Sequence, residues 1–436
     1  MPFATALAER LRALTATPTH RDLAIDQWRL VIDTGTSTEL GLKENHMGGP
    51  YEAPNRVTGT RGEAYIVWKD GRISSGTVDR TTLENLDEDL ALWRQAAYDD
   101  EFAPDVLGPQ TVPDVPIYDA EVAELVTDRQ EPLFELLERV RRDLPAYDAD
   151  RVSGSVTVSS SRRHLITSRG LDHVSAGTSF GAYADADHRV YDTLSLRRRP
   201  TEDEVATMIR QVGETNRLLR KEATLTGGRQ AILLTPFIAE AMLNKYVLGN
   251  LDGQRVLNGQ SAFSMDQFAE HAEAFHPSFG LAVDPLKPLS PGAYELTREG
   301  VPASKLTLID AGRLQTPLLD LKHAKKAGLA PTPFPRGGSS LRLSGPSAPF
   351  DEVVKGIERG LIIYQILGLH TQDGARGNFS LTVSQGLVVE NGVILGHAKA
   401  IIAGNFFQSM REGFRLGTVV GKEMPGLLLQ ADVIPG

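Results

Sequence analysis

The second half of this 436-residue sequence is built from short strand-like runs and tight turns, and this feature constrains the fold most. From about residue 280 onwards the chain reads mostly as strand and turn, with turns predicted at Ala311-Gly312 and Asn391-Gly392. Before Gly227-Gly228, strands and helices are mixed. This order fits two α+β domains better than a strict alternation of strands and helices, and we place the main boundary near residues 222–228.

The predicted N-terminal domain, residues 1–222, is a mixed domain of sheet and helix, whereas residues 223–436 form a domain dominated by antiparallel sheet. In the first domain a predicted strand leads into a Gly-rich segment at 35–62. The Pro-rich stretch at about 103–118 is expected to be an extended connector that wraps the surface. A helix is expected from Thr201, because Glu204 three residues later completes a capping box.

Composition excludes several classes of protein. The formal net charge of −10 repels phosphate backbones, so we expect no nucleic-acid partner and interpret the basic runs 139–142 and 197–199 as solvated faces. The sequence has no cysteine, which excludes disulfides, thiolate nucleophiles and cysteine ligands to zinc. The most apolar run, at 360–369, is far shorter than the ~20 residues of a membrane span. We therefore expect a soluble, cytoplasmic protein with no membrane partner.

The common catalytic motifs are absent. His271 and His276 flank Glu273, but a spacing of five turns the second imidazole about 140° away on a regular helix, which disfavours a metal site. Ser159 to Ser161 lie close to His164, yet no Gly-x-Ser-x-Gly elbow occurs. Neither of the usual glycine-rich phosphate-binding motifs is present. Read from the residues alone, the chain has no self-contained catalytic constellation.

One helix carries polar residues that packing does not explain. The stretch EAMLNKYVLGNLDG at 240–253 is an almost wholly apolar predicted helix, but Asn244 and Lys245 stand side by side within it. Apolar side chains would pack more favourably at a buried helix face.

The order of unusual segments in the second half resembles the TldD/PmbA family, also described as modulators of DNA gyrase. The segments are VDPLKPLSPGAYELTREGVPASKLTLIDAGRLQTPLLDLKHAKKAGL, then Ala375-Arg376-Gly377, the turn Glu390-Asn391-Gly392 and IIAGNFF. The resemblance covers most of the chain and is looser before residue 150. It implies the fold of that family over both predicted domains.

That family has two branches that pair with each other. TldD-like members carry H-E-x-x-x-H in the helix after the domain boundary and a cysteine near the C-terminus, which together hold zinc, with the glutamate as base. The resemblance places Asn244, Lys245, Gly249 and Val420 at these four positions. A carboxamide, an ammonium, a glycine and a valine do not supply the donors that zinc needs. The chain therefore resembles the non-catalytic TldE/PmbA-like branch, with no cofactor of its own.

The resemblance implies a subunit of a heterodimeric zinc metalloprotease, in which a TldD-like partner provides the zinc and unfolded peptides are the substrate. Arg376, Gly377 and Asn378 are candidate peptide-binding residues at a sheet edge, and an ordinary cluster at a hairpin end explains them equally well. Two alternatives stay open. The chain could be a stand-alone peptidase whose metal ligands include His271, Glu273 and His276, or a homodimeric peptide-binding protein.

Overall fold

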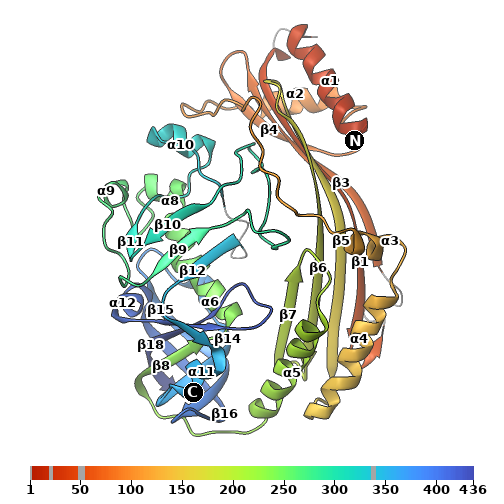
Figure 1. Cartoon of the computed structure of the whole chain (residues 1–436). Helices are drawn as coiled ribbons and strands as arrows, with labels where there is room; N and C mark the ends of the chain where they lie inside the picture. Colours follow the sequence, from red (N-terminus) through yellow and green to blue (C-terminus); the bar gives the residue numbers. More distant parts are fainter. Residues whose placement is uncertain (1, 19–22, 48–54, 335–339) are drawn as a thin grey trace.

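The computed structural model describes residues 2–18, 23–47, 55–334 and 340–436. Figure 1 shows the first half of the chain as one long, curved sheet, with the second half packed along one side of it. The predicted α+β class, with antiparallel sheets, is confirmed. In the described parts of the chain, no helix is both long and apolar enough to cross a membrane.

The N-terminal half is a seven-stranded antiparallel sheet with the strand order β4-β3-β1-β5-β6-β7, and a short β2 pairs with β1. The strands are β1 (Ile25–Lys43), β2 (His46–Met47), β3 (Asn55–Trp68), β4 (Ile73–Val78), β5 (Val152–Thr167), β6 (Asp172–Ala186) and β7 (Val190–Leu196). The helices are α1 (Pro2–Ala16), α2 (Leu86–Gln95), α3 (Ala120–Thr127), α4 (Glu131–Asp143) and α5 (Glu202–Leu219).

The described glycines of the segment 35–62 lie in long strands. β1 continues through Gly35 to Lys43, and Gly35 faces Gly59 of β3 in the antiparallel register. Small residues are tolerated here because the neighbouring strands approach closely: a Cβ at Gly35 would lie 3.0 Å from the carbonyl oxygen of Ser160 in β5. Gly35, like Gly62 of β3, therefore allows the neighbouring strands to pack closely.

The C-terminal half contains a second seven-stranded sheet and a four-stranded sheet. The first sheet contains β8 (Gly228–Leu234), β13 (Ser347–Pro349), β14 (Arg359–Leu367), β15 (Asn378–Glu390), β16 (Val393–Asn405), β17 (Arg415–Thr418) and β18 (Gly426–Pro435). The second contains β9 (Gly280–Val283), β10 (Leu306–Asp310), β11 (Arg313–Leu314) and β12 (Leu341–Ser344). The helices are α6 (Pro236–Leu243), α7 (Gly249–Leu251), α8 (Gly253–Leu257), α9 (Met265–Ala269), α10 (Leu321–Ala327), α11 (Phe350–Lys355) and α12 (Phe406–Glu412).

Five strands of the larger C-terminal sheet close into a circuit. β8 pairs with β14, and β14, β15, β16 and β18 follow in order. β18 then pairs with β8 in the antiparallel register Leu427↔Leu234 to Val433↔Gly228. The β8–β14 pair is parallel, so the sheet is antiparallel with this exception and the short β13–β17 pair.

The two halves share a hydrophobic core. Ile232 and Leu234 of β8 face the interior of the C-terminal half, whereas Leu233 joins a cluster with Met208 of α5 and Val156 of β5. β8 is therefore buried on both faces, and α5 packs between the two halves, as Figure 1 also shows. The predicted boundary near 222–228 falls in the short link between α5 and β8.

The Pro-rich stretch at 103–118 has neither helix nor strand and lies against the N-terminal sheet. Val106 and Val115 are buried, and the carbonyl of Leu107 accepts a hydrogen bond of 2.7 Å from Thr167 of β5. The side chain of Leu107 packs in a small cluster with Leu296 of the C-terminal half. This connector is therefore part of the contact between the two halves.

We expected the basic run 197–199 to be a solvated face, and this prediction is wrong for Arg197. Arg197 is buried, and its guanidinium donates to the carbonyls of Ser290 and Ala293 at 2.9 and 2.8 Å. Arg198 pairs with Glu204 at 2.7 Å. A buried guanidinium needs several acceptors, and here backbone carbonyls of the C-terminal half supply them. Arg197 therefore joins the two halves.

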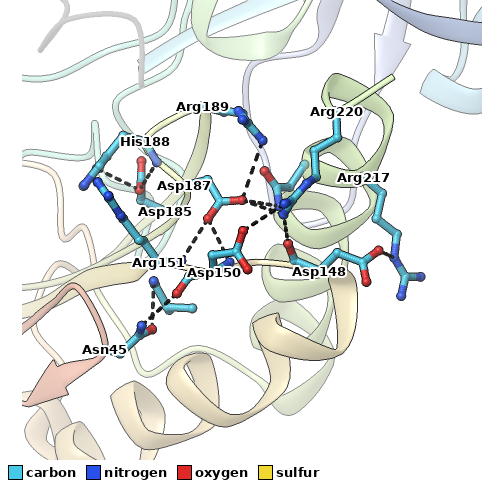
Figure 2. A network of polar contacts seen from close by, with 12 residues as sticks. Asn45, Asp148, Asp150, Arg151, Asp185, Asp187, His188, Arg189, Arg217 and Arg220 are labelled. Carbon is cyan, nitrogen blue, oxygen red and sulfur yellow. Dashed lines mark hydrogen bonds and ion pairs between the residues drawn. The ribbon is translucent and has the colours of Figure 1, made fainter. Parts of the chain in front are cut away.

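A polar network fixes the end of α5 to the turn between β6 and β7 (Figure 2). The carboxylate of Asp187 accepts from the backbone N–H groups of Asp150 and Arg151 at 2.8 and 2.9 Å. It also accepts from the side chains of Asn216 and Arg220 at 3.0 and 3.2 Å. Burial opposes ionisation of this carboxyl, but these donors hold the pKa of Asp187 below its usual range. These contacts therefore hold the C-terminal end of α5, where the link to β8 begins.

Candidate functional site

The helix that carries Asn244 and Lys245 is not regular. Pro236 occupies the first turn of α6, and the helix changes at Asn244–Leu248 into a π-turn before α7 continues it. The N–H of Gly249 is directed at the carbonyl of Asn244, five residues earlier. A π-turn joins residues i and i+5, so it brings positions 244 and 249 towards one side of the helix. Such single turns are common at functional sites.

The two histidine positions of the H-E-x-x-x-H pattern therefore correspond to 244 and 249, which the π-turn brings together, but this chain has no zinc ligands there. The Oδ1 atom of Asn244 is buried, without a hydrogen-bond partner in the described parts of the chain. The ammonium of Lys245 lies 3.4 Å from the carbonyl of His370. Gly249 offers no side chain, and the Nη1 atom of Arg255 lies 3.2 Å from where its Cβ would be.

These groups do not fit a zinc ion. Lys245 and Arg255 bring two positive charges to the helix, and both repel a cation at any reasonable dielectric constant. A carboxamide oxygen is a poor zinc donor compared with imidazole or thiolate. Val420 is 69% exposed in the loop between β17 and β18 and carries no donor atom. We therefore derive no metal chemistry for this helix.

The alternative metal ligands already have other partners. The Nδ1 atom of His271 lies 3.1 Å from the carbonyl of Leu314, and Nδ1 of His276 lies 2.8 Å from the hydroxyl of Ser278. Glu273 pairs with a neighbouring guanidinium, that of Arg313. Among the residues that the structure describes, no three His, Cys, Asp or Glu side chains gather closely enough to hold a metal ion.

The segment with Arg376, Gly377 and Asn378 leads into β15 and is held by the cap of α12. Asn405 donates at 2.8 Å both to the carbonyl of Arg376 and to Oδ1 of Asn378. Its own Oδ1 accepts from the N–H of Gln408 at 3.0 Å, which caps α12. Gly377 has a φ of +73°, and a Cβ there would overlap the ring of Phe407, so only glycine fits.

Strand addition has little room at this segment. β15 pairs with β16 from Asn378 onwards, and with β14 from Thr382 onwards. The open stretch is therefore Asn378 to Leu381, on the β14 side alone. Asn378 is engaged with Asn405, whereas the Arg376 side chain is 81% exposed and has a carboxylate of Asp373 at 3.4 Å. Of the three predicted peptide-binding residues, Arg376 is thus the one with donors to spare.

Arg376 lines a cavity of about 290 Å³ that the sequence did not reveal. Phe263 and Phe407 form an aromatic wall, with ring centroids 5.6 Å apart and a T-shaped arrangement. Arg376, Arg411 and Glu273 bring charge to the lining. The residues come from α9 and α12, from β11 and the end of β16, and from three separate loops, so no local motif in the sequence brings them together.

The comparisons with known proteins agree with this fold. Residues 227–425 match the family model described as the PmbA/TldA metallopeptidase C-terminal domain. An uncharacterised protein of Methanocaldococcus jannaschii is 26% identical over 141 residues, which are 31% of this chain and 33% of that protein. The match therefore spans about a third of the length of this relative.

Solved structures match almost the whole chain. TldE from Thermococcus kodakarensis has a TM-score of 0.83 at 17% identity, covering 99% of this chain and 100% of that one. A candidate modulator of DNA gyrase from Thermotoga maritima gives 0.79 at 19% identity, covering 98% of this chain and 99% of that one. Its counterpart from Bacteroides thetaiotaomicron gives 0.77 at 17%, covering 94% and 95%. At these identities the likeness establishes the fold.

The fold and the matched domain define a two-domain protein of the class that includes TldE and the candidate gyrase modulators. Residues 227–425, in the second half of the chain, match the PmbA/TldA metallopeptidase C-terminal domain, and the whole chain has the fold of the solved TldE structure. The predicted resemblance to this family is thereby confirmed.

Proposed function

We propose that this chain is the non-catalytic, TldE-like subunit of a heterodimeric zinc metallopeptidase that cuts unfolded peptides. In this proposal, a TldD-like partner supplies the zinc ion and the catalytic base. One observation carries it: the π-turn presents positions 244 and 249 on one side of the helix, but with an amide and no side chain there. Lys245 and Arg255 add positive charge at the same place.

Two comparisons support the proposal. The matched model is described as a metallopeptidase C-terminal domain, which supports peptide hydrolysis as the chemistry of the complex. The solved TldE structure matches this chain from end to end. A family fold without zinc donors at the motif positions fits a subunit that completes a catalytic partner.

The test is co-expression of this chain with a TldD-like chain that carries H-E-x-x-x-H. We expect a stable complex on size exclusion, about one zinc ion per heterodimer by elemental analysis, and cleavage of an unfolded peptide by the complex. The matched control replaces the motif glutamate of the partner by Gln, and this change should abolish cleavage without dissociating the complex.

Stoichiometric zinc and peptide cleavage by this chain alone would contradict the proposal and favour a stand-alone peptidase. If the chain bound peptide but did not associate with the TldD-like chain, a homodimeric peptide-binding protein would be the better description.

A further inference from the structure

We propose that the cavity between α9, α12 and the loop before β15 binds the C-terminal residue of a peptide, with its free carboxylate on Arg376 and Arg411 and an apolar side chain against Phe263 and Phe407. This inference rests on the proposed function, because it concerns the peptide substrate. It assigns the recognition of a chain end to this subunit.

The cavity has a rigid apolar wall. Phe263 and Phe407 are 5% and 6% exposed, and both rings also pack against Phe275, at 6.0 and 6.1 Å. Leu314 adds an aliphatic surface, and several alanines in the lining leave the space open. Aromatic rings held by the core present a fixed surface to a ligand, so an apolar side chain loses little entropy on binding there.

The two guanidinium groups have donors left for a ligand. Arg411 uses its Nε–H on the carbonyl of Ala274 at 2.9 Å, which fixes the side chain over the cavity. The Nε of Arg376 lies 3.4 Å from Asp373. The terminal amino groups of both arginines have no partner in the described parts of the chain. Guanidinium groups are well suited to carboxylates, because they offer two parallel N–H donors.

The acidic residue in the lining does not cancel this preference. Glu273 forms an ion pair with Arg313, so its charge is balanced from outside the cavity. Asp373 faces Arg376 from the exposed side of the loop and is 56% exposed, where water screens it. The net charge at the cavity is therefore positive, since Arg313, Arg376 and Arg411 outnumber Glu273 and Asp373.

The size of the cavity selects a chain end over the middle of a strand. At about 290 Å³ it lies at the lower end of the roughly 300–1,000 Å³ of typical ligand pockets, which suits about one residue. An internal residue brings an apolar side chain but no negative charge, whereas a C-terminal residue carries both on one Cα. The geometry therefore points to a peptide that ends in a free carboxylate.

The test is fluorescence anisotropy of the full chain with an N-terminally labelled hexapeptide of glycine and serine that ends in leucine. We expect the free-acid peptide to bind at least tenfold more tightly than the same peptide with a C-terminal amide. The double substitution Arg376→Gln and Arg411→Gln should remove this difference. Arg415→Gln, which removes one charge from β17 outside the cavity, is the matched control and should preserve it.

Equal affinity for acid and amide peptides, no binding of either up to millimolar concentration, or an equal loss with Arg415→Gln would each overturn the proposal. Circular dichroism melting of the double variant should match the wild type. Replacing Arg411 by Lys in place of Gln in that variant keeps the charge and should restore part of the acid preference. Association of the double variant with the TldD-like chain separates this test from that of the proposed function. If the wild type pairs and shows no acid preference, the cavity proposal alone fails.

Discussion

Arg198 and Glu204 form a doubly hydrogen-bonded ion pair at the start of α5. The two oxygens of Glu204 accept from the guanidinium at 2.7 and 2.8 Å, and one of them also accepts from the N–H of Thr201 at 2.8 Å. The hydroxyl of Thr201 accepts from the N–H of Glu204, which completes the predicted capping box. The Arg198 guanidinium lowers the pKa of Glu204 to about 2 from an ordinary 4.5.

This pKa predicts the pH dependence of stability. Since the folded pKa is lowered, the carboxylate stabilises the fold above about pH 4.5, and this contribution is lost as the pH falls towards 2. We expect Glu204→Gln to reduce the free energy of unfolding by about 1–3 kcal/mol at pH 7 in urea titrations. The difference from the wild type should shrink between pH 4.5 and 2.

The matched control for this substitution is Glu214→Gln on the same helix. Glu214 forms an exposed i,i+4 pair with Arg210 at 3.2 Å, and such pairs contribute less than about 0.5 kcal/mol. A loss at Glu204 that did not exceed the loss at Glu214 would contradict the role of the partly buried Arg198–Glu204 pair.

At the scale of secondary structure, the π-turn lies where the proposed alignment places the zinc-binding positions of a TldD-like chain. The turn brings positions 244 and 249 together, although a regular helix would turn them about 140° apart. Whether zinc can bind then depends on the donors and on the charge of Arg255, not on the path of the chain. If the proposed alignment holds, substitutions at these positions should create a zinc site.

We expect zinc affinity in the variant that combines Asn244→His, Lys245→Glu, Gly249→His and Arg255→Ala. Isothermal titration with zinc chloride should give a Kd in the micromolar range or below, because two imidazoles then face one another and a carboxylate replaces the positive charge of Lys245. Keeping Arg255 should weaken binding at least tenfold, since its guanidinium lies where the second imidazole must enter.

A second variant tests the π-turn itself. It carries the second histidine at Leu248, four residues from position 244, which is the spacing that a regular helix favours. Tighter zinc binding by this variant would show that the five-residue alignment does not hold in solution.

At the scale of the whole molecule, the two halves are joined by apolar packing and by buried charge. The cluster around Leu233 and Met208 spans both halves, and the guanidinium of Arg197 satisfies carbonyls of the segment at 290–293. Arg298 adds an ion pair with Asp33 of β1 at 3.1 Å. The two halves should therefore respond together when one contact between them is removed.

Arg197→Met tests this coupling. We expect the free energy of unfolding to fall by about 2–4 kcal/mol, because the carbonyls of Ser290 and Ala293 stay buried without their charged donor. Hydrogen exchange at 286–296 should accelerate as well. Arg199→Met, an exposed position two residues further on, is the control and should change stability by less than about 0.5 kcal/mol. Equal effects of the two substitutions would contradict the role of Arg197.

The sequence predicted those features that depend on nearby residues. The capping box of Thr201 and Glu204 and the turn at Asn391-Gly392 follow from local backbone chemistry, and both are present. The role of Arg197 was missed because its acceptors in the C-terminal half lie more than ninety positions away. The cavity was missed for the same reason, since Phe263 and Arg411 meet only through the tertiary fold. The π-turn was also missed, because no pattern of side chains in the sequence indicates it.

The pairing of β18 with β8 has a consequence for biosynthesis. Roughly 190 residues separate the two strands, and ribosomes add about 5–20 residues per second, so β8 waits on the order of 10–40 seconds for its neighbour. During that interval the apolar strand β8 has unpaired backbone amides on the edge that β18 later covers, and this edge can pair with other chains. Nascent chains of this protein should thus be clients of chaperones until translation has delivered the closing strand.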